Sequence, residues 1–342
     1  MRAIGYASPG PVNRPDALIE RDVPEPEATG RDLLVRVEAV SVNPVDTKVR
    51  QHDTPAAGFH VLGYDAVGVV EAAGPEASLF RPGDRVWYAG SIIRPGTNAE
   101  LHLVDERIVG PAPSSLSAAD AAALPLTMLT AWEMLFERLD VHRPVPADNR
   151  TLLIIGGAGG VGSIAIQIAK RIAGMTVIAT ASRPQTADWC KAMGADYVVD
   201  HSKPLAGEVS ALGIGAPGFV FSTTETDKHF DEIVELIAPQ GRMGVISGVG
   251  NSNVGKLSGK SVTLCFELMF TRPIFSPPDI EEQHRILRET SRLVDQGVLK
   301  STRHDHFGPI TAQNLIAAHA HVESGRAIGK AVLEGFESRP KP

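Results

Sequence analysis

Residues 151–162 read TLLIIGGAGGVG, five residues without charge followed at once by a glycine-rich turn. Gly157, Gly159 and Gly162 match the pattern G-x-G-x-x-G, and an apolar helix is predicted to begin at Ser163. Between a strand and a helix, glycines in this pattern allow a tight turn, close approach of the backbone to a ligand, and close packing of helix on strand. The stretch predicts the first strand and first helix of a doubly wound α/β sheet.

Downstream of this stretch, apolar strands alternate with longer helices. Strands are predicted at 151–155, 176–181, 197–199, 219–221, 243–246 and 262–266, and helices at 164–172, 185–193 and 230–237. This alternation is typical of a parallel sheet that is covered by helices on both faces. The predicted fold class is therefore α/β.

The flanking regions follow another pattern, that of short β-branched strands separated by Gly and Pro turns. Here strands are predicted at 33–42, 66–72, 84–87 and 330–334, and helices at 117–122, 127–138, 280–296 and 312–323. The C-terminal tail does not continue the alternation, so we expect it to return to the first domain. The predicted domains are 1–123 with 270–342, a compact β-domain, and 124–269, the doubly wound sheet.

Composition narrows the class of protein further. The chain has 342 residues, 43% of them hydrophobic, which suits two domains. The formal net charge of -7 indicates that a nucleic acid is not the partner of this protein. Cys190 and Cys265 are the only cysteines and lie far apart, so a disulfide framework is not expected. The N-terminus lacks the pattern of a signal peptide, and five glycines interrupt the uncharged stretch 152–169, which favours a cytoplasmic protein without a membrane partner.

The glycine loop predicts a dinucleotide cofactor, with phosphates bound at the helix N-terminus by the backbone of Gly157, Gly159, Gly160, Val161 and Gly162. An NAD site would place Asp or Glu about 20 residues further on.

No acidic residue occurs at that place, between Ser163 and Ala187. Instead, Ser182 and Arg183 offer donors and positive charge to a 2′-phosphate, so NADP(H) is the predicted cofactor. Arg183 as a solvated charge on a turn is the alternative.

Several spaced motifs, together with the glycine loop, resemble the medium-chain dehydrogenase/reductase superfamily. Within it, the chain is similar to quinone oxidoreductases and to relatives called zinc-type alcohol dehydrogenase-like. The motifs are SVNPVD at 41–46, LGYDAVG at 62–68, GDRV at 83–86, LPLT at 124–127 and GAD at 194–196. The resemblance implies a GroES-like β-domain, an inserted Rossmann domain, and a cleft between them.

Zinc-dependent members of that superfamily would carry a cysteine at position 43, a histidine at position 64 and a third ligand near Leu126. This sequence has Asn43 and Tyr64 there, and no cysteine in 91–104, where a structural zinc site would need four. We therefore expect no bound metal. The pairs His304/His306 and His319/His321 could bind a metal only with further ligands, so surface or helix-end histidines are the preferred interpretation.

Further cofactor contacts are predicted from position. The resemblance suggests that His201 lies near the adenosine phosphate, with an ordinary loop role left open. Ser222 and Thr223 end one predicted strand and Gly248 follows another, at the sheet edge where such folds bind ligands. Lys330 is a candidate cofactor contact, with a solvated charge as the alternative.

The resemblance places Asn43 and Tyr64 in the vacated metal site, facing the nicotinamide, as candidate catalytic donors to a substrate carbonyl. The alternatives are a turn residue before Pro44 and a packed tyrosine. A metal-free site suits hydride addition to electron-poor acceptors, so we predict an NADPH-dependent reductase of quinones or α,β-unsaturated carbonyls. Candidate substrate contacts, each of which could instead be core, are Tyr64, Trp87, Thr127, Met128 and Phe266.

Two other functions stay open at this stage. One is an NADPH-dependent reductase of enoyl thioesters or other activated alkenes, and the other is a non-catalytic NADPH-binding redox sensor. The predicted strand 262–266 would form an apolar sheet edge, which favours pairing in a twofold homodimer.

Overall fold

The computed structural model describes residues 1–146 and 150–337, and the chain divides into two compact units. The first unit comprises Met1–Leu126 and Phe270–Pro342, of which 338–342 lie outside the described residues, and the second comprises Thr127–Met269. The ranges expected from the sequence differ from this division only at residues 124–126.

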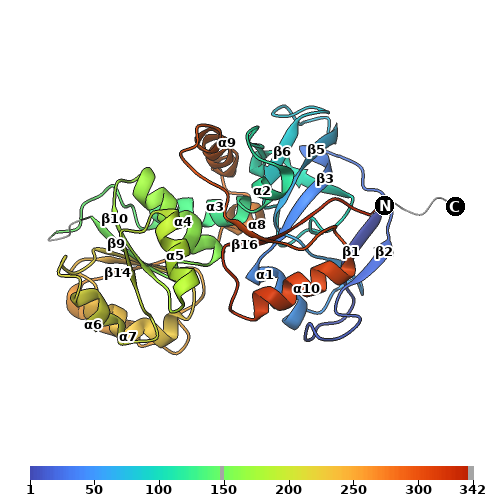
Figure 1. The fold of residues 1–342 in the computed structure, drawn as a ribbon. Helices are drawn as coiled ribbons and strands as arrows, with labels where there is room; N and C mark the ends of the chain where they lie inside the picture. Colours follow the sequence, from blue (N-terminus) through green and yellow to red (C-terminus); the bar gives the residue numbers. More distant parts are fainter. Residues whose placement is uncertain (147–149, 338–342) are drawn as a thin grey trace. The chain divides into compact units, whose positions relative to one another are not determined.

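The second unit contains a six-stranded parallel sheet with the order β11-β10-β9-β12-β13-β14. Its strands are β9 (Thr151–Ile155), β10 (Thr176–Thr180), β11 (Tyr197–Val199), β12 (Phe219–Ser222), β13 (Arg242–Val245) and β14 (Thr263–Phe266). Its helical segments are α4 (Gly160–Arg171), α5 (Pro184–Met193), α6 (Leu205–Ser210), α7 (Thr226–Leu236), η2 (Glu133–Arg138) and η3 (Val254–Lys260). The predicted doubly wound sheet is confirmed, with α4 beside α5 and α6 beside α7 (Figure 1).

Helix α4 begins at Gly160, three residues before the predicted start at Ser163. The glycine motif itself forms the first helical turn, although glycine disfavours helix interiors. Packing explains why glycine is needed: a Cβ on Gly162 would lie 2.3 Å from the carbonyl oxygen of Gly156. The apolar periodicity begins only after the glycine motif, so the helix start predicted from it was too late.

The predicted helix 127–138 is two segments with different geometry. It consists of α3 (Pro125–Trp132), with proline in its first turn, followed by η2, which is wound as a wider π-helix. Met134 of η2 packs against Gly244 of β13 so closely that a Cβ there would lie 2.2 Å from its sulfur. A glycine in this buried strand thus makes room for the wide turn.

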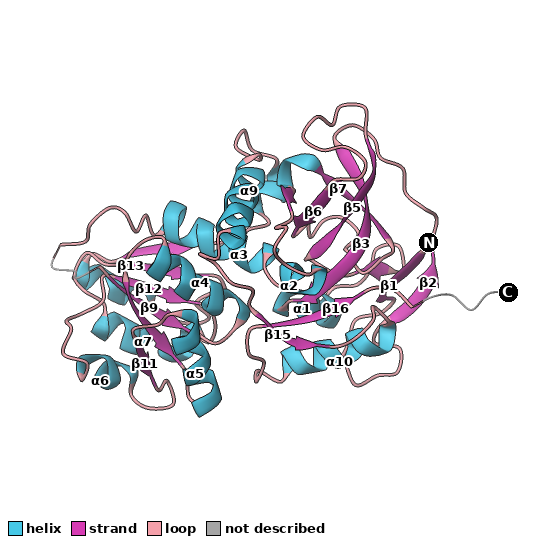
Figure 2. Ribbon diagram, turned by 45° about the horizontal axis from the view of Figure 1, so that its top comes forward, coloured by secondary structure: helices cyan, strands magenta, loops and turns pink. Residues whose placement is uncertain are grey.

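The first unit is built from two β-sheets and several helices (Figure 2). A seven-stranded sheet has the order β15-β16-β3-β5-β6-β8, with β7 also paired to β3, and a smaller sheet has the order β2-β1-β4. The strands are β1 (Arg2–Tyr6), β2 (Ile19–Asp22), β3 (Asp32–Val42), β4 (His60–Val61), β5 (Ala66–Ala73), β6 (Arg85–Tyr88), β7 (Leu101–Asp105), β8 (Gly110–Pro111), β15 (Arg303–His306) and β16 (Lys330–Glu334). The helical segments are α1 (Pro44–His52), η1 (Glu106–Ile108), α2 (Ala118–Ala122), α8 (Thr271–Phe275), α9 (Glu282–Asp295) and α10 (Ala312–Glu323).

The C-terminal tail returns to this unit, as predicted, because β16 pairs antiparallel with β3. The pairing sets Ala331 opposite Val42 and thereby brings Lys330 to the end of β3, just before Asn43. Helix α1, which follows Asn43, was not predicted, and Asn43 was considered as a turn residue before Pro44. Proline is favoured at the first position of a helix, and Asp46 accepts a hydrogen bond from the backbone N–H of Asn43.

Within the described part of the chain, no helix is both long enough and apolar enough to cross a membrane.

Candidate active site and cofactor site

The glycine loop connects β9 to α4 and leaves its backbone accessible. Gly156 has a φ of 78°, in the left-handed region that favours glycine. A Cβ on Gly157 would lie 2.8 Å from the Cβ of Ala179 and 3.0 Å from the sulfur of Cys190, so packing requires glycine there. At Gly159 a Cβ would meet nothing nearer than 3.5 Å, which leaves this residue free to approach a ligand.

The first turn of α4 offers backbone N–H groups to an anion. Gly160 and Val161 are half-buried, and the helix that they begin is 12 residues long. Free N–H groups and the helix dipole together favour phosphate at such an end. These residues fit the diphosphate of a dinucleotide cofactor.

The ends of β10 and β11 are tied to this loop by side chains. The hydroxyl oxygen of Thr180 accepts a hydrogen bond of 3.1 Å from the backbone N–H of Gly156, and Nδ1 of His201 lies 3.0 Å from the same oxygen. Ser182 is exposed, and Arg183 caps the N-terminus of α5. Thus Ser182, Arg183 and His201 follow the carboxyl ends of adjacent strands.

The other predicted cofactor residues of the second unit differ in whether the protein itself already occupies their polar groups or the space around them. Ser222 is buried and shares a hydrogen bond of 2.9 Å with Thr226, and the hydroxyl of Thr223 donates to the carbonyl of Ile155. Gly248 has open space around it, since a Cβ there would meet its nearest neighbour only at 4.0 Å.

In the first unit, Asp65 lies at the centre of a buried polar cluster. One carboxylate oxygen accepts hydrogen bonds from the hydroxyl of Ser41 at 2.7 Å, Nδ2 of Asn43 at 2.7 Å and Nζ of Lys330 at 3.1 Å. The other accepts the backbone N–H of Leu126 at 2.7 Å. Lys330 is only 4% exposed, so its interpretation as a solvated charge is wrong.

The amide of Asn43 has one possible orientation in this cluster. Its Oδ1 accepts from the ammonium of Lys330, which can only donate, and its Nδ2 donates to Asp65, which can only accept. Among the described residues, no partner is recorded for the second hydrogen of Nδ2. Lys330 and Asp65 thus fix the orientation of the Asn43 amide, and one of its two N–H groups remains available to donate a hydrogen bond.

Asp46 supports both segments that carry the predicted donors. Its carboxylate oxygens accept the backbone N–H of Asn43 at 2.8 Å and of Gly63 at 2.9 Å. Burial raises the pKa of Asp46 to about 7, although these donors and Lys330 act in the opposite direction. This one carboxyl group therefore sets the positions of residues 43 and 63, directly before Tyr64.

Tyr64 is fully buried, and its hydroxyl lies 3.5 Å from Nε2 of His60. Its ring packs edge-on against Phe270, with centroids 5.4 Å apart. Burial, followed by the nearby charge of Asp46, raises the pKa of Tyr64 above its usual range. Its hydroxyl therefore stays protonated at neutral pH and can donate a hydrogen bond.

The predicted substrate residues are buried with one exception. Trp87 and Met128 have no exposed surface and Thr127 has 2%, which favours core packing for these three side chains. Phe266 on β14 is 58% exposed.

Two of the paired histidines have a carboxylate neighbour: His304 and His321 both contact Asp305, at 3.1 and 3.0 Å. His319 is fully buried beside Arg50, so its interpretation as a surface histidine is wrong. Across residues 1–146 and 150–337, no group of three or more His, Cys, Asp or Glu side chains is arranged to hold a metal.

Sequence reasoning missed Asp46 and Asp65 as parts of the site. Each left a signal: Asp46 is an acid three residues after a helix-capping Asn, and Asp65 is a charge directly before an apolar strand.

Comparison with known proteins places these two units in a family. Residues 29–114 match the family model of the alcohol dehydrogenase GroES-like domain, and residues 160–301 match that of zinc-binding dehydrogenases. A zinc-type alcohol dehydrogenase-like protein of Staphylococcus aureus is 41% identical over 335 residues, which cover 97% of this chain and 99% of that protein. This chain belongs to the medium-chain dehydrogenase/reductase superfamily and is an oxidoreductase of that family.

Other relatives narrow the comparison. A solved structure from Rhizobium etli, described as a candidate zinc-dependent alcohol dehydrogenase, is 58% identical with a TM-score of 0.97 and covers 99% of both chains. A mycobacterial protein solved in complex with NADPH is 28% identical with a TM-score of 0.83, covering 98% of this chain and 100% of that one. A tomato 2-methylene-furan-3-one reductase is 28% identical, over 97% of this chain and 79% of its own length.

The family descriptions mention zinc, but the residues of this chain do not fit it. By the resemblance described above, Asn43 and Tyr64 occupy the positions expected of zinc ligands, and amide and phenol groups are not among the usual ligands of zinc. The glycine loop, in contrast, fits the nicotinamide cofactor that the family uses.

Proposed function

We propose that this protein is an NADPH-dependent, zinc-independent reductase of quinones or α,β-unsaturated carbonyl compounds. The observation that carries the proposal is the fixed amide of Asn43, held between Lys330 and Asp65 with one hydrogen left to donate. The relationship to an enone reductase supports this substrate class.

The amide can do the work that a metal would otherwise do. The bound cofactor supplies the hydride, and negative charge then develops on the carbonyl oxygen of the substrate. A donor held in position stabilises that charge without reorganising, and Lys330 at Oδ1 polarises the amide and strengthens its N–H as a donor. Tyr64 is the second proposed donor, and solvent protonates the enolate carbon of an enone.

The preference for NADPH rests on the end of β10. No acidic residue follows this strand before Asp188, whereas Ser182, Arg183 and His201 lie at the same edge of the sheet. A carboxylate there would repel a 2′-phosphate, and cationic or hydrogen-bonding groups attract it. The NADPH complex of the mycobacterial relative supports this choice.

A cytoplasmic homodimer completes the proposal. Strand β14 forms one edge of the six-stranded sheet, as predicted; its last residue, Phe266, is 58% exposed, and Leu268, just after it, is 53% exposed. Such an edge favours pairing with its symmetry copy. Both cysteines are free thiols, which suits a reducing compartment. A monomer in light scattering at micromolar concentration would contradict the dimer.

The decisive assay follows NADPH oxidation by absorbance with phenanthrenequinone and with a short alkyl enone. Parallel reactions contain NADH, or NADPH with a metal chelator. We expect turnover that prefers NADPH and is unchanged by the chelator. Tight NADPH binding without turnover would contradict the proposed reaction, and loss of activity on chelation would contradict the zinc-independent site.

A further inference from the structure

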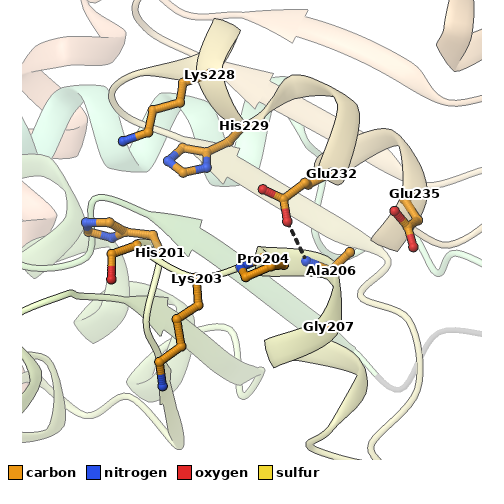
Figure 3. A pocket seen from close by; sticks show the side chains of 10 residues that line it. His201, Lys203, Pro204, Ala206, Gly207, Lys228, His229, Glu232 and Glu235 are labelled. Atoms are coloured by element: carbon orange, nitrogen blue, oxygen red, sulfur yellow. Dashed lines mark hydrogen bonds between the residues drawn. The ribbon is translucent and has the colours of Figure 1, made fainter.

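The histidine side chains of the two units differ in what lies beside them. In the second unit, His201 and His229 face each other across a groove of about 590 Å³ between α6 and α7, with ring centroids 6.0 Å apart (Figure 3). Basic and acidic side chains both line this groove, so its charge does not favour one kind of ligand. In the first unit, His60 lies beside Tyr64, a proposed hydrogen-bond donor to the substrate.

The small sheet of the first unit holds His60 in place. His60 lies on β4, where it pairs with Tyr6 of β1, and the two rings pack edge to face with centroids 5.9 Å apart. The side chain of His60 is half-buried, whereas Tyr6 and Tyr64 are buried. Its Nε2 lies 3.5 Å from the hydroxyl oxygen of Tyr64. The imidazole ring of His60 therefore reaches from the surface to a buried hydroxyl group.

The two ring nitrogens of His60 have different surroundings. Nε2 faces Tyr64, while no partner of Nδ1 is recorded among the described residues. Nor is Nδ1 one of the buried unpaired atoms of residues 1–146 and 150–337, so water can reach it. An imidazole can accept a proton at one nitrogen and release one from the other. His60 thus has the arrangement of a path for protons from solvent to Tyr64.

Charged and titratable groups of the neighbouring elements act on this pair. Tyr6 lies on β1, the exposed Asp53 follows α1, and Asp46 in α1 acts on Tyr64. Burial lowers the pKa of His60 below its usual range, although the charge of Asp53 acts in the opposite direction. The ring is therefore mainly neutral at neutral pH. A neutral ring has one nitrogen free to accept a proton, which a relay requires.

Tyr64 needs such a partner because its phenolate form is costly. Burial, followed by the charge of Asp46, raises the pKa of Tyr64 above its usual range. The hydroxyl can therefore give its proton to a substrate only if another proton reaches the phenol oxygen in the same step. Within the described residues, Nε2 of His60 is the recorded hydrogen-bond partner of that oxygen. Catalytic hydrogen bonds are often this long without substrate and shorten in its complex.

We propose that His60 is a positioning residue that acts through Tyr64 and relays protons to it during the reduction of quinones. The inference rests on the proposed function and deepens it. Hydride transfer oxidises NADPH to NADP⁺ and reduces the quinone by two electrons to a hydroquinone monoanion. The anionic oxygen then takes the proton of the Tyr64 hydroxyl, the phenol oxygen takes the proton on Nε2 of His60, and Nδ1 takes a proton from solvent.

The two proposed substrate classes differ in their need for this proton. A quinone product is protonated on oxygen, next to the donors, whereas an enone product is protonated on carbon by solvent. Substitution of His60 should therefore slow quinone reduction more than enone reduction. A general disturbance of the site would slow both reactions alike.

The test measures kcat for NADPH oxidation with phenanthrenequinone and with a short alkyl enone. His60→Gln keeps an N–H group but has no second ring nitrogen to take up a proton. It should lower kcat about tenfold for the quinone and less than about twofold for the enone, a smaller effect than loss of a general acid because Tyr64 remains. The control is His306→Gln, an exposed histidine of β15 in the same unit, which should leave both values unchanged.

Two further measurements test the relay in other ways. Tyr64→Phe removes the hydroxyl group and should change the ¹⁵N chemical shift of Nε2 of His60 more than that of Nδ1, without any turnover. Added imidazole should restore part of the quinone reduction in His60→Ala and none in Tyr64→Phe. Thermal unfolding checks that each variant is folded, and His60→Ala provides the test even if His60→Gln fails to fold.

The outcomes separate the relay from the proposed function. Equal losses with both substrates in His60→Gln, or no loss, would overturn the relay and leave the proposed function in place. An unchanged ¹⁵N shift in Tyr64→Phe, or His60→Ala without rescue by imidazole, would do the same. Wild-type protein that reduces only the enone would also overturn the relay. Wild-type protein that reduces neither substrate would refute the proposed function, and the relay with it.

Discussion

In the first unit, the carboxylate of Asp65 accepts four hydrogen bonds and is fully buried, whereas in the second unit the equally enclosed His229 leaves Nδ1 without a recorded partner among the described residues. The first arrangement is complete within the protein and fixes the orientation of Asn43. The second leaves one ring nitrogen unsatisfied within the described part of the chain. Side chains that satisfy one another can therefore hold a donor rigid, whereas an unsatisfied buried atom costs stability.

The largest effect is expected when the complete cluster loses one charge. Lys330→Met leaves Asp65 buried without its counter-ion and should lower the free energy of unfolding by about 3–5 kcal/mol. Adding Asp65→Asn removes the uncompensated charge and should recover part of that loss. Urea unfolding of the single and double variants measures the coupling, and additive losses would show that the two groups do not act as a pair.

The second prediction distinguishes a hydrogen bond donated by Asn43 to the substrate from a general effect of the substitution on stability. Asn43→Ala removes the amide but keeps the backbone N–H bound by Asp46, and kcat should fall by about 10²–10³-fold, the usual effect of losing an oxyanion donor. Thr290→Ala is the control, because Thr290 is fully buried in the same unit and, among the described residues, its hydroxyl bonds only within α9. A fall in kcat of similar size in both variants would assign the effect to general disruption.

A smaller effect concerns the pH dependence of stability through Asp46. Its pKa rises from 3.8 to about 7 on folding, so the folded protein binds the proton more tightly than the unfolded chain. Stability should therefore fall as the pH rises from about 5 to about 7, by roughly 2 kcal/mol from this group. Asp46→Asn should flatten this slope in urea unfolding measured at both pH values. An unchanged slope would show that the carboxyl group is already ionised at pH 5.

Local patterns allowed much of the fold to be predicted from the sequence. The strand and glycine loop at 151–162 carry their own signals, and α10 and β16 have the predicted bounds. The start of α4 was misplaced because its first turn consists of motif residues without apolar periodicity, and α1 was missed because proline both starts helices and makes turns.

The two parts of the candidate site, the cofactor loop and the cluster around Asp65, also differed in how well the sequence predicted them. The cofactor loop is continuous in sequence and could be recognised there. The cluster around Asp65 joins Asn43 to residues 22 and 287 positions away, and only the pairing of β16 with β3 brings Lys330 to it. The unpaired nitrogen of His229 depends on packing between helices, which a single sequence does not specify.

The close packing of Gly157 against Cys190 also makes the Cys190 thiol a probe of local opening in this region. Cys190 is fully buried, and burial raises the pKa of its thiol to about 12, so the reactive thiolate is almost absent at neutral pH. An alkylating reagent can reach this sulfur only when α5 separates briefly from the glycine loop. In a Cys265→Ser background, the labelling rate should count these openings, and NADPH should slow it by holding the loop in place. Because Gly157 has no side chain, the sulfur of Cys190 fits against the cofactor loop, and alkylation of this sulfur reports how often α5 and the loop separate.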